Sequence, residues 1–137
     1  MELTIPKVLL QVFHIFTICC LALDFVTDCY FLSGKEFSWT IHTGVNPKYR
    51  YYNMGFLFNM AALVYLLLAV FLIVVEVLAL LEIKIFEVFE RGIVKPIVII
   101  CVGLGHLGMC GDLGLASGIL TLFAGVIWLI LAVLLMI

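Results

Sequence analysis

Long apolar runs alternate with short polar stretches along this chain, and each run is long enough to cross a lipid bilayer. The runs cover about 8–32, 55–81, 93–110 and 113–137. A membrane-spanning helix needs about 20 mostly apolar residues, and in lipid only helices and closed barrels satisfy every backbone polar group. The pattern therefore predicts an all-α integral membrane protein, a four-helix bundle in which residues 1–137 form a single four-span domain.

Two polar stretches of different character separate the first three spans. Residues 34–53 form the one sizeable polar loop. Residues 82–92 instead alternate charged with bulky apolar side chains, and at helical spacing Ile85, Phe86 and Phe89 share one face. This alternation predicts a short amphipathic connector that lies in the headgroup region.

The last two predicted spans are joined by a very short turn at Gly111-Asp112, and the segment around this turn is rich in glycine. Eight of the eleven glycines fall between residues 82 and 128. Apolar burial gives little net gain between helices in lipid, so close van der Waals contact at small residues is a main source of association. We expect helix packing at five of these glycines: Gly105, Gly108, Gly114, Gly118 and Gly125.

Composition supports the membrane class and excludes others. The chain is 66% hydrophobic and 12% charged, whereas soluble domains are roughly 45–50% apolar and about 25% charged. A net charge of -2 without any basic run gives no indication of a nucleic-acid partner. The expected partners are the lipid bilayer and other membrane proteins, in a homo-oligomer or a hetero-oligomer.

The distribution of basic residues predicts the orientation. With four spans, the N-terminus, the 82–92 connector and the C-terminus share one side of the membrane. That side holds four basic residues against three on the other: Lys7, Lys84, Arg91 and Lys95 against Lys35, Lys48 and Arg50. Because short cytosolic loops carry an excess of Lys and Arg, both termini are predicted to be cytosolic.

Four ionisable residues inside the predicted spans are the candidates for chemistry, because such groups are costly in lipid. A rise of about 1.5 Å per residue places Asp24 and His106 at one depth and His14 and Glu76 at another. The two pairs are interpreted either as a polar track for protons or cations, or as hydrogen-bonded clasps between helices. The clasps are favoured, because about 15–20 Å of depth separates the pairs without an ionisable residue between them.

The remaining polar features carry simpler expectations. Asp28 and Asp112 fall near the far interface, where water would solvate them. The segment 103–108, GLGHLG, would expose carbonyls to an ion if it unwound, as in transporters with broken helices. Close packing is the commoner use of such glycines.

Motifs for catalysis and metal binding do not occur in the sequence. There is no nucleophile with a base at recognisable spacing, no phosphate-binding glycine loop and no HExxH. The five cysteines lack zinc-type spacing and are interpreted as buried or lipid-facing thiols, with palmitoylation and a disulfide as alternatives. We therefore expect no enzyme, and no catalytic, cofactor-binding or metal-binding residues.

The order of motifs along the chain resembles a known family. Pro6-Lys7 precedes the first span, Phe89-Glu-Arg-Gly92 opens the third, and LASGILTLFAG at 115–125 lies in the fourth. This arrangement resembles the COPI-associated Golgi membrane protein family, a group of small four-span proteins. The resemblance implies a non-enzymatic protein of Golgi and endosomal vesicles that is involved in vesicle-mediated transport.

The resemblance also directs attention to one surface. Members of the family carry a polar cytosolic tail after the last span, whereas this chain stops at Ile137. A contact with vesicle coat or cargo would then use the connector, with four candidate residues: Lys84, Phe86, Phe89 and Arg91. The alternatives to a vesicle role are a small ion channel or a proton- or cation-coupled carrier that uses the intramembrane carboxylates, and an accessory subunit of a larger membrane complex.

Overall fold

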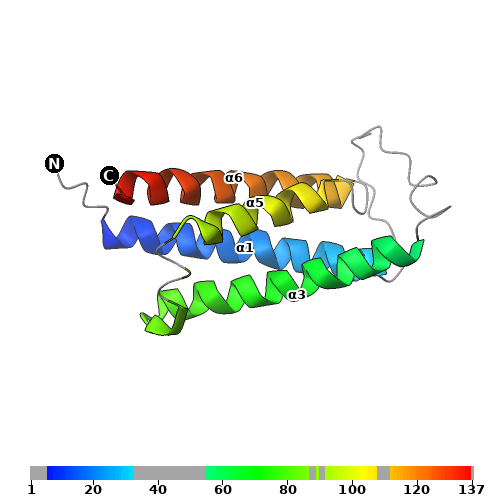
Figure 1. Ribbon diagram of the computed structural model, residues 1–137, viewed down its shortest axis with the longest axis horizontal. Coiled ribbons are helices and arrows are strands. Elements are labelled where there is room, and N and C mark those ends of the chain that lie inside the picture. The colour runs from blue at the N-terminus through cyan, green and yellow to red at the C-terminus, as the bar shows by residue number, and fades with distance from the viewer. Residues whose placement is uncertain (1–5, 33–54, 87–88, 90–91, 108–111, 137) are drawn as a thin grey trace.

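The computed structural model describes residues 6–32, 55–86, 89, 92–107 and 112–136, and this part of the chain is helical without strands (Figure 1). Its elements are α1 (Lys7–Leu32), α3 (Gly55–Leu80), the 3-10 turn η1 (Lys84–Phe86), α5 (Val94–His106) and α6 (Asp112–Met136). The predicted all-α fold with four helices is therefore confirmed. The observed helices begin and end within a few residues of the predicted spans, because the length of an apolar run is a local property of the sequence.

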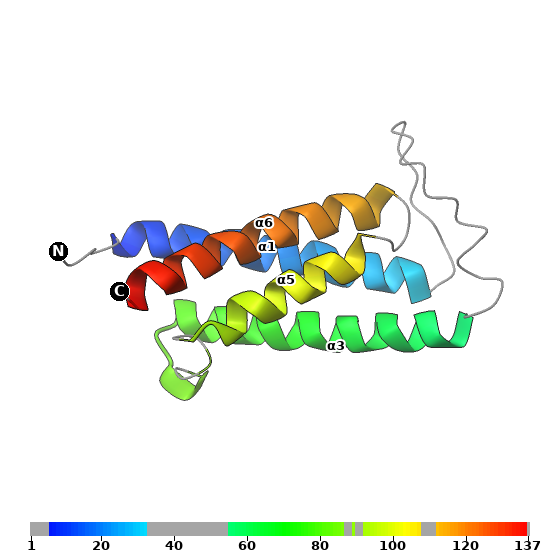
Figure 2. The same cartoon turned by 45° about the horizontal axis from the view of Figure 1, so that its top comes forward.

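Successive long helices run in opposite directions, so that the start of α1 and the end of α6 lie at the same end of the bundle (Figures 1 and 2). The main packing pairs are α5 with α6, α1 with α3, and α1 with α6. Helices α3 and α5 make few contacts with each other. Helix α1 thus connects the α5–α6 pair to α3.

The buried side chains of α1 recur every three or four residues and so lie on one face of the helix. They include both polar and apolar types: His14, Thr17, Cys20, Leu21, Asp24, Thr27, Asp28 and Phe31. This face carries half of the buried polar and charged residues among those that the structure describes.

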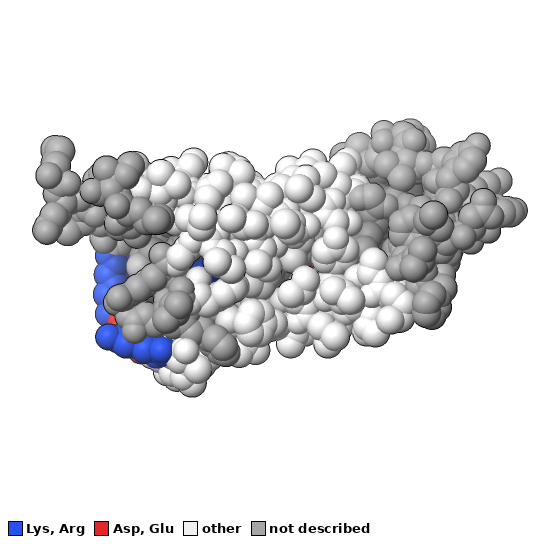
Figure 3. Space-filling model, viewed as in Figure 1, with Lys and Arg blue, Asp and Glu red and all other residues white. Residues whose placement is uncertain are grey.

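The lengths and the outer surface of the helices fit a membrane. Three of them are long and apolar enough to cross one, at Lys7–Leu32, Met60–Leu80 and Leu113–Leu134. Helix α5 is apolar but has 13 residues, about 20 Å of helix against a hydrocarbon core of about 30 Å. The described surface between the two ends of the bundle is almost free of charge in Figure 3, and the charged residues seen there gather at one end.

Helices α5 and α6 approach until their backbones touch. A Cβ atom added at Gly118 would lie 2.8 Å from the carbonyl oxygen of Gly103, and one added at Gly103 would lie 3.0 Å from the carbonyl oxygen of Gly118. At Gly125 an added Cβ would lie 2.7 Å from Ile100 Cγ1 and 3.0 Å from the Ile100 nitrogen. Only residues without a side chain permit such a separation.

The predicted packing glycines are distributed as follows. Gly118 and Gly125 lie at the α5–α6 contact, and Gly105 faces α3, where an added Cβ would lie 2.2 Å from the ring of Tyr65. Gly114 is buried, and Gly108 lies outside the described residues. Gly103, at the centre of the contact, was not among the predicted packing positions.

The described start of the predicted amphipathic connector is a turn. Helix α3 ends in a Schellman-type turn, in which Ile83 N–H donates to Leu78 O at 2.9 Å and Glu82 N–H donates to Ala79 O at 3.1 Å. Glu82 occupies the left-handed position of this turn, with φ 60°. The chain therefore leaves the helical conformation at Glu82, and the next described element is the 3-10 turn η1 at Lys84–Phe86.

Two of the four candidate contact residues have described side chains, and these two, Lys84 and Phe89, do not share one exposed face. Lys84 is exposed, but the Phe89 ring packs edge-on against Phe71, with ring centroids 5.8 Å apart. Phe89 also packs against the main hydrophobic core. Ile85, which was expected on the same face as Phe89, is 72% exposed. The Phe86 side chain and Arg91 lie outside what the structure describes.

Candidate functional site: two buried polar clusters

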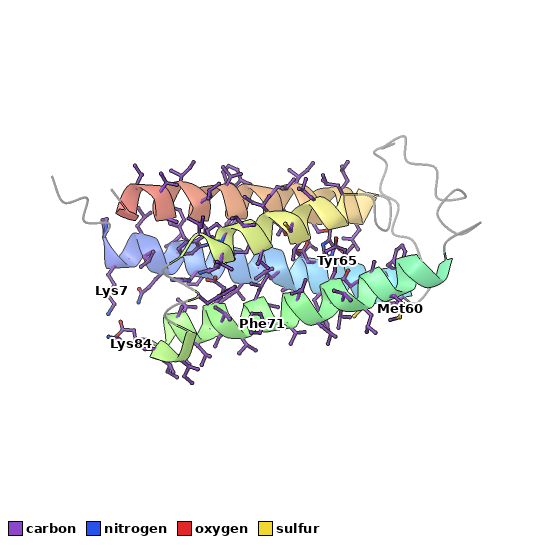
Figure 4. All side chains as sticks on the ribbon, viewed as in Figure 1. Lys7, Met60, Tyr65, Phe71 and Lys84 are labelled. Atoms are coloured by element: carbon purple, nitrogen blue, oxygen red, sulfur yellow. The ribbon has the colours of Figure 1, made fainter. Side chains whose placement is uncertain are left out.

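The bundle encloses two clusters of polar side chains, and each of the helices α1, α3, α5 and α6 contributes to both. The first cluster consists of His14 and Thr17 on α1, Glu76 on α3, Lys95 on α5 and Trp128 on α6. The second consists of Asp24, Thr27 and Asp28 on α1, Tyr65 on α3, His106 on α5, and Ser117 and Thr121 on α6. Figure 4 shows Tyr65 on the side of α3 that faces the other helices.

Glu76 lies at the centre of the first cluster. Its Oε2 accepts a hydrogen bond from Nδ1 of His14, and its Oε1 forms an ion pair with Nζ of Lys95. The side chains of Glu76 and Lys95 are 0% and 2% exposed. A carboxylate and an ammonium group buried together cancel each other's charge, which makes their presence in lipid tolerable.

Trp128 closes the first cluster from α6. The Lys95 ammonium lies 4.0 Å from the centroid of the Trp128 ring, a cation–π geometry. The indole Nε1 donates to Thr17 Oγ1 at 2.6 Å, and the Thr17 hydroxyl donates to Phe13 O at 2.8 Å. The first cluster therefore ties α6 to α1 and α5.

His106 is the centre of the second cluster. Its Nδ1 donates to the Val102 carbonyl oxygen at 2.7 Å, and its Nε2 lies 2.8 Å from Asp28 Oδ1. Because a carbonyl oxygen can only accept, Nδ1 carries a hydrogen. The contact between Nε2 and Asp28 must then hold a second proton, shared between the imidazole and the carboxyl group.

Hydroxyl groups link α1 to α6 beside this histidine. Thr121 donates to Asp24 Oδ2 at 2.6 Å. Thr27 donates to Leu23 O at 2.9 Å and lies 3.2 Å from Ser117 Oγ. Ser117 in turn donates to Gly114 O at 3.2 Å.

The structure brings together one of the two predicted pairs as expected and rearranges the other. His14 and Glu76 meet directly. His106 meets Asp28 instead of Asp24, whose Oδ1 lies 4.0 Å from His106 Nδ1. Asp28 was expected in water at the interface and is 0% exposed, which corrects that expectation. Asp24 and Asp28 are four residues apart on one helix face, where Asp28 contacts His106 on α5 and Asp24 accepts a hydrogen bond from Thr121 on α6.

Lys95 was not predicted in this cluster, because it lies at the edge of the third span and resembles a flanking charge that sets the orientation. Its depth along the helix nevertheless matches that of Glu76. Lys95 lies eight residues before position 103, the middle of the third span, which is about 12 Å toward the end that holds Glu76. The neutral partners Thr17, Ser117 and Trp128 carry no comparable signal in the sequence.

An apolar layer lies between the two clusters. It is formed by Leu21, Leu72, Ile99 and Val102, each 0% exposed and packed into one hydrophobic core. His14 and Asp24 are ten residues apart on α1, a separation of about 15 Å along the helix. The two clusters are therefore separate polar sites in an otherwise apolar interior.

Exposed charges at one end of the bundle form a third polar feature. Lys7 forms an ion pair with Glu82, and both side chains are exposed. The hydrogen bond from Lys7 and its positive charge lower the pKa of Glu82. Figure 4 shows Lys84 at the same end as Lys7, so this end carries the basic side chains of a membrane-proximal surface.

Comparisons of the chain with models of protein families, with curated proteins and with solved structures find no match.

Proposed function

We propose that this protein is a non-enzymatic, four-span component of Golgi and endosomal vesicle membranes that acts as a structural or cargo-associated element in vesicle-mediated transport. The resemblance of its sequence motifs to those of the COPI-associated Golgi membrane protein family supports a location in Golgi and endosomal membranes. The inward-facing polar clusters support the structural role, since each connects all four helices while the outer surface remains apolar.

The observation that carries the structural role is the apolar layer of Leu21, Leu72, Ile99 and Val102. A carrier of protons or cations needs polar groups or water at every depth that its substrate crosses. Here the polar groups form two clusters, and fully buried aliphatic side chains fill the layer between them. This arrangement fits clasps that hold helices in register better than it fits a conducting track.

Flux measurements test the structural role. The protein and its Asp24→Asn variant are reconstituted in liposomes under a proton or sodium gradient with a voltage bias. We expect no flux above that of empty liposomes for either protein. Flux in the wild type that disappears in Asp24→Asn would overturn the structural role and make this protein a carrier or channel.

Localisation and binding measurements test the cellular role separately. The tagged protein is expected to co-localise with Golgi and endosomal markers, and purified coat protein is expected to bind it in nanodiscs. Lys84→Glu should weaken coat binding, whereas Lys84→Arg, which keeps the charge, should not. Accumulation at the plasma membrane, or equal binding by both variants, would contradict the proposed vesicle role.

A further inference from the structure

The second cluster contains two buried oxygen atoms that lack a hydrogen-bond partner. They are Asp24 Oδ1 and Asp28 Oδ2, on two residues that are each 0% exposed. A buried acceptor without a partner is costly, and a buried carboxylate without one is more so. These two oxygens indicate that the cluster holds something in addition to its side chains in their fully ionised forms.

The charge of the cluster leads to the same conclusion. With both carboxyl groups ionised, the cluster carries one excess negative charge when His106 is an imidazolium and two when it is neutral. The first cluster does not compensate, because Lys95 is already paired with Glu76 on the far side of the apolar layer. One more positive charge is needed for neutrality in a membrane interior.

A proton fits this requirement better than a metal ion. Among the described residues, no three His, Cys, Asp or Glu side chains gather in a way that could hold a metal ion. A proton needs only a carboxyl oxygen and a nearby acceptor. The remaining question is which of the two carboxyl groups holds it.

The contacts distinguish the two aspartates. Asp28 faces the His106 Nε2 at 2.8 Å, which is the geometry of an ion pair. Asp24 lies 4.0 Å from Nδ1, whose hydrogen is already donated to Val102 O, so Asp24 lacks a comparable charged partner. Asp24 accepts a hydrogen bond from a neutral hydroxyl, that of Thr121, and the hydroxyl of Ser117 lies nearby.

The hydroxyls can accommodate a protonated Asp24. Thr121 donates to Oδ2, the oxygen that remains a carbonyl when Oδ1 is protonated. Ser117 faces the same carboxyl group and donates its own hydrogen to Gly114 O. The Ser117 oxygen is therefore available to accept a hydrogen bond from the Asp24 hydroxyl.

We propose that Asp24 is a proton-binding site that keeps its carboxyl group neutral at neutral pH beside an ionised Asp28–His106 pair. The titratable groups around it come from three helices: Asp28 and Cys20 from α1, Tyr65 from α3 and His106 from α5. The described part of α6 adds only the two hydroxyls. The site does not depend on the cellular role proposed above, so either can fail alone.

Loss of this proton has a structural consequence. It leaves two carboxylates one helical turn apart and a single imidazolium to balance them, directly at the contact between α1, α5 and α6. As long as Asp24 keeps this proton, the folded bundle binds one more proton than the unfolded chain at a pH above the ordinary titration range of aspartate, about pH 3.9. The equilibrium constant for folding should therefore fall as pH rises, by up to about tenfold per pH unit from this site.

Infrared spectroscopy of the full chain in nanodiscs tests the proposal directly. At neutral pH the wild type should show the carbonyl stretch of a protonated carboxyl group, and the band should shift when aspartate carries ¹³C at its side-chain carboxyl. The band should disappear in Asp24→Asn and persist in Glu76→Gln, which changes a carboxylate of the first cluster that is already paired with Lys95.

Each outcome decides the proposal. If the wild type lacks the band, or if its band does not shift when aspartate is labelled, the proposal is disproved without any variant. The test therefore remains possible even if Asp24→Asn does not fold. A folded Asp24→Asn that keeps the band overturns the assignment to Asp24. Loss of the band when sodium replaces potassium at constant pH overturns the proton as the ligand and assigns a sodium ion instead.

Discussion

Gly118→Ala should weaken the bundle through a single methyl group. The new Cβ would lie 2.8 Å from Gly103 O and 2.9 Å from the Leu107 nitrogen, and ordinary contacts begin near 3.4 Å, so α5 and α6 must separate by about 0.6 Å at this point. Overpacking of this kind typically costs about 1–3 kcal/mol. The higher helix propensity of alanine offsets at most about 1 kcal/mol. Gly118→Leu adds three more carbon atoms at the same place and should cost more.

Gly105→Ala provides a useful comparison, because its added Cβ would lie closer to the neighbouring atoms but those atoms belong to a side chain that can move. The added Cβ would lie 2.2 Å from the Tyr65 ring, and a side chain can rotate away where the Gly103 backbone cannot. We expect the cost to follow Gly118→Leu, then Gly118→Ala, then Gly105→Ala.

The assay is reversible unfolding in mixed detergent micelles, followed by circular dichroism and by protease sensitivity. Ile119→Ala serves as the control, since Ile119 adjoins Gly118 and is 53% exposed on the lipid side. Leu131→Ala, on a half-buried residue of the same helix, should likewise be mild. Gly118→Ala with the stability of Ile119→Ala would refute the argument that backbone contact holds α5 to α6.

Three further predictions concern charges. Lys95→Met leaves Glu76 buried without its ammonium partner and should destabilise the bundle by about 3 kcal/mol. Adding Glu76→Gln to this variant should recover part of the lost stability in the same unfolding assay. If the stability losses of the two single variants simply add in the double variant, the ion pair does not stabilise the bundle. Lys7→Met should return the lowered pKa of Glu82 toward 4.5, as measured on the Glu82 carboxyl carbon by NMR, and an unchanged titration would disprove the contact. Because the pKa of Glu82 is lower in the folded state, the stabilisation from this ion pair is present above pH 4.5 and disappears as pH falls through the folded-state pKa. A cysteine placed at Lys84 should react with a membrane-impermeant reagent from the cytosolic side and one in the loop 34–53 from the other side, and the reverse pattern would show that the predicted orientation is wrong.

The helices were predictable because apolar run length needs no knowledge of the neighbours. The depth of a residue in the membrane also follows mainly from its position along its own helix, and this depth correctly predicted that His14 contacts Glu76. The choice between Asp24 and Asp28 as the partner of His106 depends on how α5 rotates and slides against α1, which only tertiary packing decides. The turn at Glu82 was also hidden, since glutamate rarely occupies a left-handed position and no glycine marked the end of α3.

The polar face of α1 has a consequence for biosynthesis. Asp24 and Asp28 find their partners on α5 and α6, which the ribosome produces long after α1 has reached the membrane. An aspartate near the centre of an inserting helix disfavours insertion by about 2.5–3.5 kcal/mol. The insertion of α1 therefore carries an unfavourable free energy that is offset only when α5 and α6 supply partners. A nascent chain that stalls before α6 would expose these carboxyl groups to lipid or to the insertion machinery. Completion of α6 is thus the step that supplies the hydroxyl partner of Asp24, and chains with and without α6 should differ in the exposure of this polar face.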